Sequence, residues 1–396
     1  MRSSSKPLFE GLKKGIQDAG VDIINIGLIS TDILYYASGK LNLPGIMITA
    51  SHNPKEWNGF KFCQKKARPV GQGTGLEKIK QLSSQYQEKK SKGKIYPKNI
   101  LHDYKKFVLS FINKKNIKPL KIAVDAGNGM AGKIVPFIFK ELPIKIIPLF
   151  FKLDGNFPNH PANPIEKKNL KDLIKKVKQT KANLGMAFDG DADRVFFVDE
   201  KGKTIPGSAI VAMIAENLLI KNPGKKIIYD LRCSHTVPET IKANKGKPIK
   251  ERVGHSFIKA TMKKTGAIFA GEISGHYYYQ DNFRADSGII TALIITEMVS
   301  QSSKPISDLI KKFQKYHQIE ETNFKVPDKN QMIKKLKKIY SSGKQNQLDG
   351  LTVEYPNWWF NVRPSNTEPV LRLNLEAQTK KLMLEKKKEL SKILKS

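Results

Sequence analysis

The chain has 396 residues, of which 39% are hydrophobic, so we expect more than one packed core and several domains. No stretch reaches the roughly 20 uninterrupted apolar residues that cross a bilayer, and the first residues, MRSSSKPLFE, lack the apolar segment of a secretory signal. We therefore predict a cytoplasmic protein with no membrane partner. The two cysteines, Cys63 and Cys233, are too few for a disulfide framework or a zinc cluster, which suits a reducing compartment.

The formal net charge of +34 suggests a nucleic-acid-binding protein as an alternative, because clustered basic side chains release counterions from phosphate backbones. The lysines, however, are spread along the chain beside apolar helix positions, as in LKDLIKKVKQT, so nucleic acid is not favoured as a partner. Arginine is rare among the basic residues, and we expect it where a planar, bidentate donor is required. The arginines are Arg2, Arg68, Arg194, Arg232, Arg252, Arg284, Arg363 and Arg372.

Helix and strand patterns alternate along most of the chain. GLKKGIQDAGVDIINIGLI predicts a helix ended by Gly20 and then a strand, and LKIAVDAGNGMAGKIVPFIFKEL predicts a strand, a glycine turn and a helix. LKDLIKKVKQTKANLGMAFDG predicts a helix and a strand, and KKIIYDLRCSHTVPETIKANK a strand, a turn and a helix. This alternation favours α/β domains with mostly parallel sheets.

The last part of the chain has a different pattern. LDGLTVEYPNWWFNVRPSNTEPVLRLNLEAQT predicts antiparallel strands around a loop, followed by a lysine-rich helix. We therefore expect three similar α/β domains, with mixed or parallel sheets, and a C-terminal α+β domain. The predicted domains are residues 1–100, 101–205, 206–315 and 316–396.

Three of the predicted strands end in short polar turns: GIMITASHNP, LGMAFDGDADR and AIFAGEISGH. In open α/β sheets ligands bind beyond the carboxyl ends of strands, so these turns are candidates for one site. In DGDADR, the carboxylates of Asp189, Asp191 and Asp193 alternate and suit a hard cation that prefers oxygen ligands. A solvated acidic turn is the alternative, although Arg194 is an unusual companion for it.

Ser51 stands alone as a nucleophile candidate in TASHNP. No G-x-S-x-G motif surrounds it, so a hydrolase triad is not supported. A phosphorylated Ser51 would carry close to two negative charges and could share a cation with the three aspartates. Lys61 could then neutralise charge during transfer of the phosphoryl group. A local turn serine and an exposed lysine are the alternatives.

Two further motifs suit the recognition of a phosphorylated sugar. In GEISGH, the alternating residues Glu272, Ser274 and His276 are expected on one side of an extended segment, where they could bind sugar hydroxyls. A structural strand end is the alternative. In RPSNTEPVLRL, the candidate anion site consists of Arg363, Ser365, Asn366, Thr367 and Arg372, which combine guanidinium, hydroxyl and amide donors.

These four motifs, in this order, resemble the α-D-phosphohexomutase superfamily, and specifically its phosphomannomutase/phosphoglucomutase branch. TASHNP resembles the phosphoserine loop, DGDADR the magnesium loop, GEISGH the sugar-recognition loop and RPSNTEP the phosphate-binding loop. The resemblance covers essentially the whole chain and implies the four-domain architecture of that family, with one of these loops in each domain. It also implies an isomerase that interconverts hexose 1-phosphates and 6-phosphates through a phosphoserine and a 1,6-bisphosphosugar.

The resemblance implies a role for each motif residue. Ser51 would be phosphorylated and would bind Mg²⁺ together with the three aspartates, and a hexose 1,6-bisphosphate would prime it. Lys61 and His255, in GHS, would be the candidate general acid and base, with Arg194 as a further catalytic residue. The implied contacts to the phosphorylated hexose are Arg232, Glu272, Ser274, His276, Arg363, Ser365, Asn366, Thr367 and Arg372.

By the same resemblance the chain lacks an N-terminal segment. Members of the family begin with a strand carrying an Arg-x-Tyr-Asp-Ile-Arg-Gly-like motif, and this chain starts after it. The first domain would then lack sheet strands and a basic residue near the phosphoserine. We expect such a chain to bind magnesium and sugar phosphate but to turn over poorly.

Other activities remain open from the sequence. A phosphoglucosamine mutase is one, although GEISGH is more typical of enzymes that accept mannose and glucose. Another is a phosphotransferase of the haloacid-dehalogenase type, in which Asp189 itself would be phosphorylated. The oligomeric state is not predicted.

Overall fold

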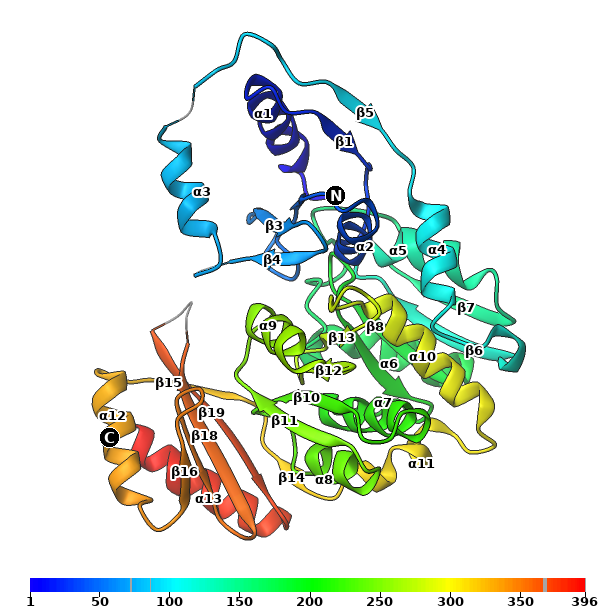
Figure 1. Cartoon of the computed structure of the whole chain (residues 1–396). Coiled ribbons are helices and arrows are strands. Elements are labelled where there is room, and N and C mark those ends of the chain that lie inside the picture. The colour runs from blue at the N-terminus through cyan, green and yellow to red at the C-terminus, as the bar shows by residue number, and fades with distance from the viewer. Residues whose placement is uncertain (72, 86, 366–368, 396) are drawn as a thin grey trace. The chain divides into compact units, whose positions relative to one another are not determined.

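The computed structural model describes residues 1–71, 73–85, 87–365 and 369–395. Figure 1 shows the elements in chain order from α1 to α13. The chain forms two compact units, each made of several segments. The first unit contains Met1–Ile205, Met262–Ala270 and Ser274–Leu309, and the second contains Pro206–Thr261, Gly271–Ile273 and Ile310–Ser396.

The first unit begins with helix α1 (Ser5–Asp18) and strand β1 (Ile23–Asn25), as the sequence predicts. Gly20 lies between them at φ +73°, a left-handed conformation that glycine adopts without a steric cost. Strand β1 pairs in parallel with β5 (Ile95–Pro97).

The next strands form an antiparallel sheet, which differs from the expected mostly parallel arrangement. Strands β2 (Gly45–Ile48), β3 (Phe60–Gln64) and β4 (Arg68–Val70) follow one another in the order β2-β3-β4. The connections between them contain no helix and are too short for the crossover that a parallel pair needs. Helix α2 (Thr31–Leu41) precedes this sheet in the sequence and is buried from Thr31 to Ser38. Helix α3 (Leu76–Ser83) follows the sheet in the sequence.

A four-stranded sheet in the order β7-β6-β8-β9 carries the acidic loop. Strand β6 (Leu120–Asp125) pairs in parallel with β7 (Ile144–Leu149) and β8 (Leu184–Phe188), and β9 (Val195–Asp199) pairs with β8 in antiparallel fashion. Every residue of β8 is buried, which explains why its sequence, LGMAF, is apolar without alternation.

Helices α4 (Leu101–Leu109), α5 (Ala131–Phe139) and α6 (Lys171–Thr180) accompany this sheet. Helix α6 buries Leu173 and Val177, and its lysines lie on the other positions, as expected of an amphipathic helix. Two short 3₁₀ helices, Lys114–Asn116 and Lys167–Leu170, lie in the connections. The predicted strand, glycine turn and helix over β6 and α5, and the predicted helix and strand over α6 and β8, are confirmed.

The last part of the first unit includes β13 (Tyr277–Tyr279), α10 (Gly288–Gln301) and α11 (Ile306–Leu309). Nearly all of α10 is buried, as expected of a helix that is apolar on every side. Its N-cap, Ser287, accepts a hydrogen bond of 3.1 Å from the backbone N–H of Ile290.

The second unit begins with α7 (Gly207–Lys221), β10 (Lys226–Asp230), α8 (Thr236–Ala243) and β11 (Lys247–Glu251). Strands β10 and β11 are parallel, and the predicted strand, turn and helix over β10 and α8 are confirmed. The division between the units falls within α9 (His255–Thr265) and β12 (Phe269–Gly271).

The C-terminal part of the second unit is an antiparallel sheet, as predicted. After a 3₁₀ helix at Lys311–Phe313, its strands are β14 (His317–Gln318), β15 (Thr322–Lys325), β16 (Lys344–Asn346), β17 (Leu351–Glu354), β18 (Trp358–Pro364) and β19 (Val370–Ala377). Helices α12 (Lys329–Ile339) and α13 (Lys380–Lys395) share a hydrophobic core with the sheet. No helix in the described residues is both long enough and apolar enough to cross a membrane.

Candidate active site

The serine loop and the acidic loop meet, although Ser51 and Asp189 are 138 positions apart in the chain. Ser51 follows β2 at φ +48°, and its Oγ donates a hydrogen bond of 2.6 Å to Asp189 Oδ2. Asp189 follows β8 and is fully buried. Gly190 permits this approach, because a Cβ at that position would lie 2.5 Å from the backbone oxygen of Ser51. The two strand ends therefore form one site.

Arg194 joins the serine to the acidic loop. Its Nη2 donates a hydrogen bond of 3.1 Å to Ser51 Oγ, and its Nε donates one of 2.9 Å to Asp189 Oδ2. The side chain is buried. A guanidinium held against the hydroxyl in this way can stabilise negative charge on a group attached to that hydroxyl.

Lys61, from β3, forms ion pairs with Asp191 and Asp193. Its Nζ is 2.9 Å from Asp191 Oδ2 and 2.6 Å from Asp193 Oδ2. Thr31 and Thr49 also donate hydrogen bonds to Asp191 Oδ2, at 2.6 and 3.1 Å. These cationic and hydroxyl donors offset part of the repulsion among three buried carboxylates.

Two carboxylate oxygens of the acidic loop have no hydrogen bond among the described residues. They are Asp191 Oδ1 and Asp193 Oδ1, and both are buried. Asp189, Asp191 and Asp193 each offer an oxygen within 4.8 Å of the others. Buried oxygens without hydrogen bonds are costly, and an all-oxygen donor set suits a hard divalent cation, so the residues fit a metal site.

The pKa directions reflect this crowding of charges. Burial raises the pKa of Asp189 to about 7, although Arg194 opposes the shift. Burial acts to lower the pKa of Lys61, but Asp191 and Asp193 outweigh it and hold that pKa well above its usual range. Lys61 is therefore a cation at neutral pH, whereas the charge of Asp189 is sensitive to what binds beside it.

Arg2 holds the backbone of the serine loop. Its Nη1 donates hydrogen bonds to the carbonyl oxygens of Pro54, at 2.6 Å, and Trp57, at 3.0 Å. Its Nη2 donates to those of Ser51, at 3.0 Å, and Asn53, at 2.7 Å. The side chain of Arg2 is buried. One guanidinium thus fixes the turn that carries Ser51.

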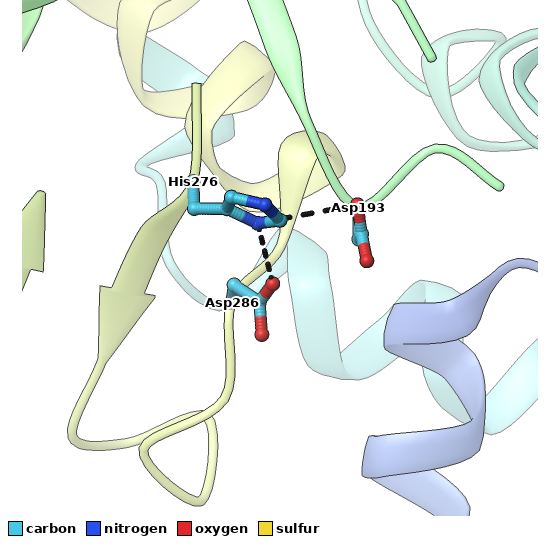
Figure 2. A group of neighbouring side chains, drawn as sticks. All are labelled: Asp193, His276 and Asp286. Atoms are coloured by element: carbon cyan, nitrogen blue, oxygen red, sulfur yellow. Dashed lines mark hydrogen bonds and ion pairs between the residues drawn. The ribbon is translucent and has the colours of Figure 1, made fainter. Parts of the chain in front are cut away.

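His276 lies between two carboxylates of the first unit (Figure 2). Its Nδ1 is 2.8 Å from Asp286 Oδ2 and 4.0 Å from Asp193 Oδ1. Asp286 is buried, so it fixes the orientation of the imidazole ring. The sequence predicted an extended segment over Glu272, Ser274 and His276, and this is wrong: the chain turns at Ile273 and Ser274, with Gly275 at φ +86°, because it must connect β12 to β13 within a few residues.

In the second unit, Arg232 lies between carboxylates. Its Nη2 is 2.9 Å from Asp230 Oδ2 and 3.9 Å from Glu272 Oε1. Glu272 is buried, and its Oε1 accepts a hydrogen bond of 3.3 Å from the backbone N–H of Gly254. His255, the next residue, begins α9 and is exposed. Two of the predicted substrate contacts and one candidate acid or base therefore lie near one another in this unit.

The predicted phosphate site lies at the ends of β18 and β19. Arg363 and Arg372 face each other across these strands, and the carboxylate of Glu321 bridges them. Ser365 is buried and its backbone N–H bonds to the Val370 carbonyl oxygen at 2.9 Å. Asn366 and Thr367 lie outside the described residues.

Family models match almost the whole chain. The models for the α/β/α domains I, II and III of phosphoglucomutase/phosphomannomutase match residues 1–90, 98–202 and 206–316. The model for the C-terminal domain matches residues 321–393. The chain belongs to the phosphoglucomutase/phosphomannomutase family. It accordingly has the four-domain architecture of the phosphohexomutases and is an enzyme of the isomerase class. The domain boundaries proposed from the sequence stay predictions.

Relatives of this phosphohexomutase match over its full length. A phosphomannomutase of Vibrio cholerae is 38% identical over 100% of this chain and 88% of its own length. A phosphohexose mutase of Xanthomonas campestris is 37% identical over 100% of this chain and 90% of its own length. Among solved structures, a phosphoglucomutase/phosphomannomutase family protein from Burkholderia thailandensis matches with a TM-score of 0.89 and 31% identity, covering 99% of this chain and 87% of that one.

The sequence did not single out every residue that shapes the site of this phosphohexomutase. Thr31 and Glu321 carried no motif signal, because their partners come from distant segments. Asp286 lies ten residues after its partner His276, outside the GEISGH motif. Asp32 was also missed: it is fully buried and accepts hydrogen bonds from Tyr104 and Ser287, at 2.6 and 2.7 Å. Arg2 had a signal, since it is one of the few arginines in a lysine-rich chain.

Proposed function

We propose that this phosphohexomutase interconverts the 1-phosphates and 6-phosphates of mannose and glucose by passing a phosphoryl group through Ser51. The observation that carries the proposal is the contact of Ser51 Oγ with Asp189 Oδ2 at 2.6 Å, beside buried carboxylate oxygens that accept no hydrogen bond among the described residues. The Vibrio cholerae relative, named a phosphomannomutase, supports mannose as one of the sugars.

In this proposal Ser51 carries the phosphoryl group, and Asp189, Asp191 and Asp193 hold Mg²⁺. When bound, Mg²⁺ would neutralise charge on the phosphoryl oxygens. Arg194 stabilises the negative charge at Ser51 because its guanidinium already donates a hydrogen bond to the Ser51 hydroxyl. Lys61 keeps Asp191 and Asp193 charge-balanced and is a candidate acid or base, together with His255.

The remaining residues bind the hexose. Arg232, Arg363, Ser365 and Arg372 hold the phosphate that does not react, while Glu272, Ser274 and His276 bind sugar hydroxyls. The reaction is then a transfer from phosphoserine 51 to the free hydroxyl of the hexose phosphate, which gives a 1,6-bisphosphosugar. After this intermediate turns around, its other phosphate returns to Ser51. Most of the rate enhancement comes from positioning and electrostatics.

The test combines an assay and a covalent trap. The purified protein is assayed with mannose 1-phosphate, glucose 1-phosphate and glucosamine 1-phosphate, each with a trace of the matching 1,6-bisphosphate and Mg²⁺. We expect turnover of the mannose and glucose substrates, and an acid-stable phosphoserine at Ser51. Ser51→Ala should lose both, whereas Ser110→Ala, at an exposed serine, should lose neither.

Two results would contradict the proposal. An acyl phosphate on Asp189, cleaved by hydroxylamine, would indicate the aspartyl phosphotransferase instead. If the protein turned over glucosamine 1-phosphate alone, the proposed mannose and glucose substrates would be wrong, but the transfer through Ser51 would still stand.

A further inference from the structure

Glu321 occupies an anion position among three arginines of the second unit. Its Oε2 accepts hydrogen bonds from Arg363 Nη2 at 3.0 Å and Asn374 Nδ2 at 2.9 Å. Its Oε1 accepts one from Arg372 Nη1 at 3.3 Å. Arg232 Nη1 lies 3.9 Å from Oε2. Planar guanidinium groups that converge in this way suit a phosphate as well as they suit a carboxylate.

The strand register brings these groups together. Arg363 and Arg372 are directly opposite each other in the β18–β19 pair, and like charges in that position destabilise a sheet. Glu321 immediately precedes β15, which pairs with β19 so that Asn323 lies opposite Arg372. The carboxylate of Glu321 is thus delivered to the arginine pair, where it offsets their repulsion.

Glu321 does not use every donor of Arg363. Arg363 is only 6% exposed, and its Nε has no hydrogen-bond partner among the described residues. Burial acts to raise the pKa of Glu321, but Arg363 and Arg232 outweigh it and hold that pKa below its usual range. Glu321 is therefore a charged carboxylate wherever the enzyme is assayed near neutral pH.

We propose that Glu321 is a resident anion that takes the place of the non-reacting phosphate of the substrate and is displaced when that phosphate binds. This inference rests on the proposed function, in which Arg363 and Arg372 hold that phosphate. The arginines then never face one another without an anion. Phosphate binding becomes an exchange of one anion for another, so the bisphosphosugar is released more readily for its turn in the site.

The test measures phosphate binding with and without the competing carboxylate. The probe is inorganic phosphate, titrated calorimetrically into the unmodified protein, the Glu321→Gln variant and a control. Glutamine keeps the shape and one acceptor oxygen but removes the charge. We expect the Kd for phosphate to fall about tenfold in Glu321→Gln, because hydrogen bonds between charged groups no longer have to be broken first. The KM for the hexose phosphate should fall in parallel, and kcat should fall because release is slower.

The control is Glu354→Gln, which removes a carboxylate from the same sheet. Glu354 pairs with Lys250 at 2.6 Å and not with the arginines of the site, so its loss changes the net charge equally and should leave the Kd for phosphate unchanged. If Glu321→Gln does not fold, Glu321→Asp provides the same test. Its carboxylate is one methylene shorter and competes less well, so it should also lower the Kd.

The outcomes separate this inference from the proposed function. If folded Glu321→Gln bound phosphate more weakly than the unmodified protein, Glu321 would only support the arginines. That result would contradict the displacement of Glu321 and leave the proposed function standing. Phosphate binding that is unaffected by Arg363→Gln would overturn the phosphate site itself, and the displacement with it.

Discussion

Ser51 Oγ and Asp189 Oδ2 lie 2.6 Å apart at the ends of β2 and β8, strands that belong to two different sheets. The candidate nucleophile, Ser51, is therefore in direct contact with the candidate cation site. Chemistry at the serine and binding at the aspartates should respond to the same substitutions.

Arg2 is expected to act as a positioning residue for Ser51. Lysine keeps the charge of Arg2 but cannot reach four carbonyl oxygens, and glutamine loses the charge as well. Because small displacements of a reacting group cost about 100-fold in rate, Arg2→Gln should lower kcat by about that factor and change the KM for the hexose phosphate by less than about twofold. Arg2→Lys should retain intermediate activity. Steady-state kinetics check both values.

The control for Arg2 is Arg68→Lys, which changes an exposed arginine of the same unit and should leave kcat unchanged. Since the lost hydrogen bonds are worth about 1 kcal/mol each, Arg2→Gln should also reduce the free energy of unfolding, measured with urea. An Arg2→Gln enzyme that raises KM with normal kcat would contradict a positioning role.

Mg²⁺ should stabilise the protein through the acidic loop. Asp191 and Asp193 each have a buried oxygen without a hydrogen bond among the described residues, so cation binding relieves a cost that the metal-free protein carries. We expect Mg²⁺ to raise the Tm of the protein, and EDTA to reverse the rise and abolish turnover. Asp191→Asn should lose the Mg²⁺-dependent shift, while Asp103→Asn, at an exposed position on α4, should keep it. An equal shift in both variants would place the ion elsewhere.

Lys61 should weaken Mg²⁺ binding and at the same time increase kcat. Its ammonium contacts Asp191 and Asp193, so its removal leaves the negative charge of these carboxylates less compensated. Lys61→Met is expected to bind Mg²⁺ more tightly, by about tenfold, because like charges near the ion are removed. Its kcat should nevertheless fall about 100-fold or more, the usual loss when an acid or base is removed. Calorimetry and kinetics measure the two effects.

Lys105→Met is the matched control for Lys61. Lys105 pairs with Glu141 at 2.7 Å on the surface of the same unit, so its loss should affect neither Mg²⁺ binding nor kcat. Weaker Mg²⁺ binding by Lys61→Met would show that the lysine organises the aspartates more than it repels the ion.

The pair of His160 and Asp125 should make stability depend on pH. His160 Nε2 is 2.9 Å from Asp125 Oδ2. Burial acts to lower the pKa of His160, but the hydrogen bond and charge of Asp125 outweigh it and raise that pKa. A raised pKa in the folded state stabilises the protein fully below the unfolded-state value of about 6.5, and this gain is lost as the pH rises through the folded-state value.

Consequently, His160→Gln should lower Tm most near pH 6 and least near pH 9. His317→Gln, at an exposed histidine, should show a difference that does not vary with pH. A Tm loss for His160→Gln that is constant over this range would mean that the imidazole acts through packing and not through its charge.

Much of the fold follows from local patterns. The buried apolar run of β8, the amphipathic α6 and the glycine turn after β6 each have a sequence signal that depends only on near neighbours. The antiparallel β2, β3 and β4 were not predicted, because the direction of a strand pair depends on which strands meet, and periodicity carries no information on that. The turn at Ile273 and Ser274 was missed for a related reason: alternating polar residues occur in strands and in tight connections alike.

The site was predictable where one short motif supplies several groups. Asp189, Asp191, Asp193 and Arg194 come from a single loop, and the structure brings them to Ser51 and Lys61. Arg2, Thr31 and Glu321 act through partners that are tens of residues away or more. Their importance depends on tertiary contacts, so a single sequence shows at most that an arginine is unusual in this chain.

The hydrogen bonds that Arg2 donates to the serine loop all go to main-chain oxygens in the described residues, so they do not depend on which side chains occupy the loop. Lys55 and Glu56 are exposed, so we expect substitutions at these two positions to leave the hydroxyl of Ser51 in place, whereas His52, whose Nδ1 is 3.3 Å from Ser51 Oγ, should be kept. The backbone of the serine loop is thus held by Arg2, while exposed side chains of the same loop are open to substitution.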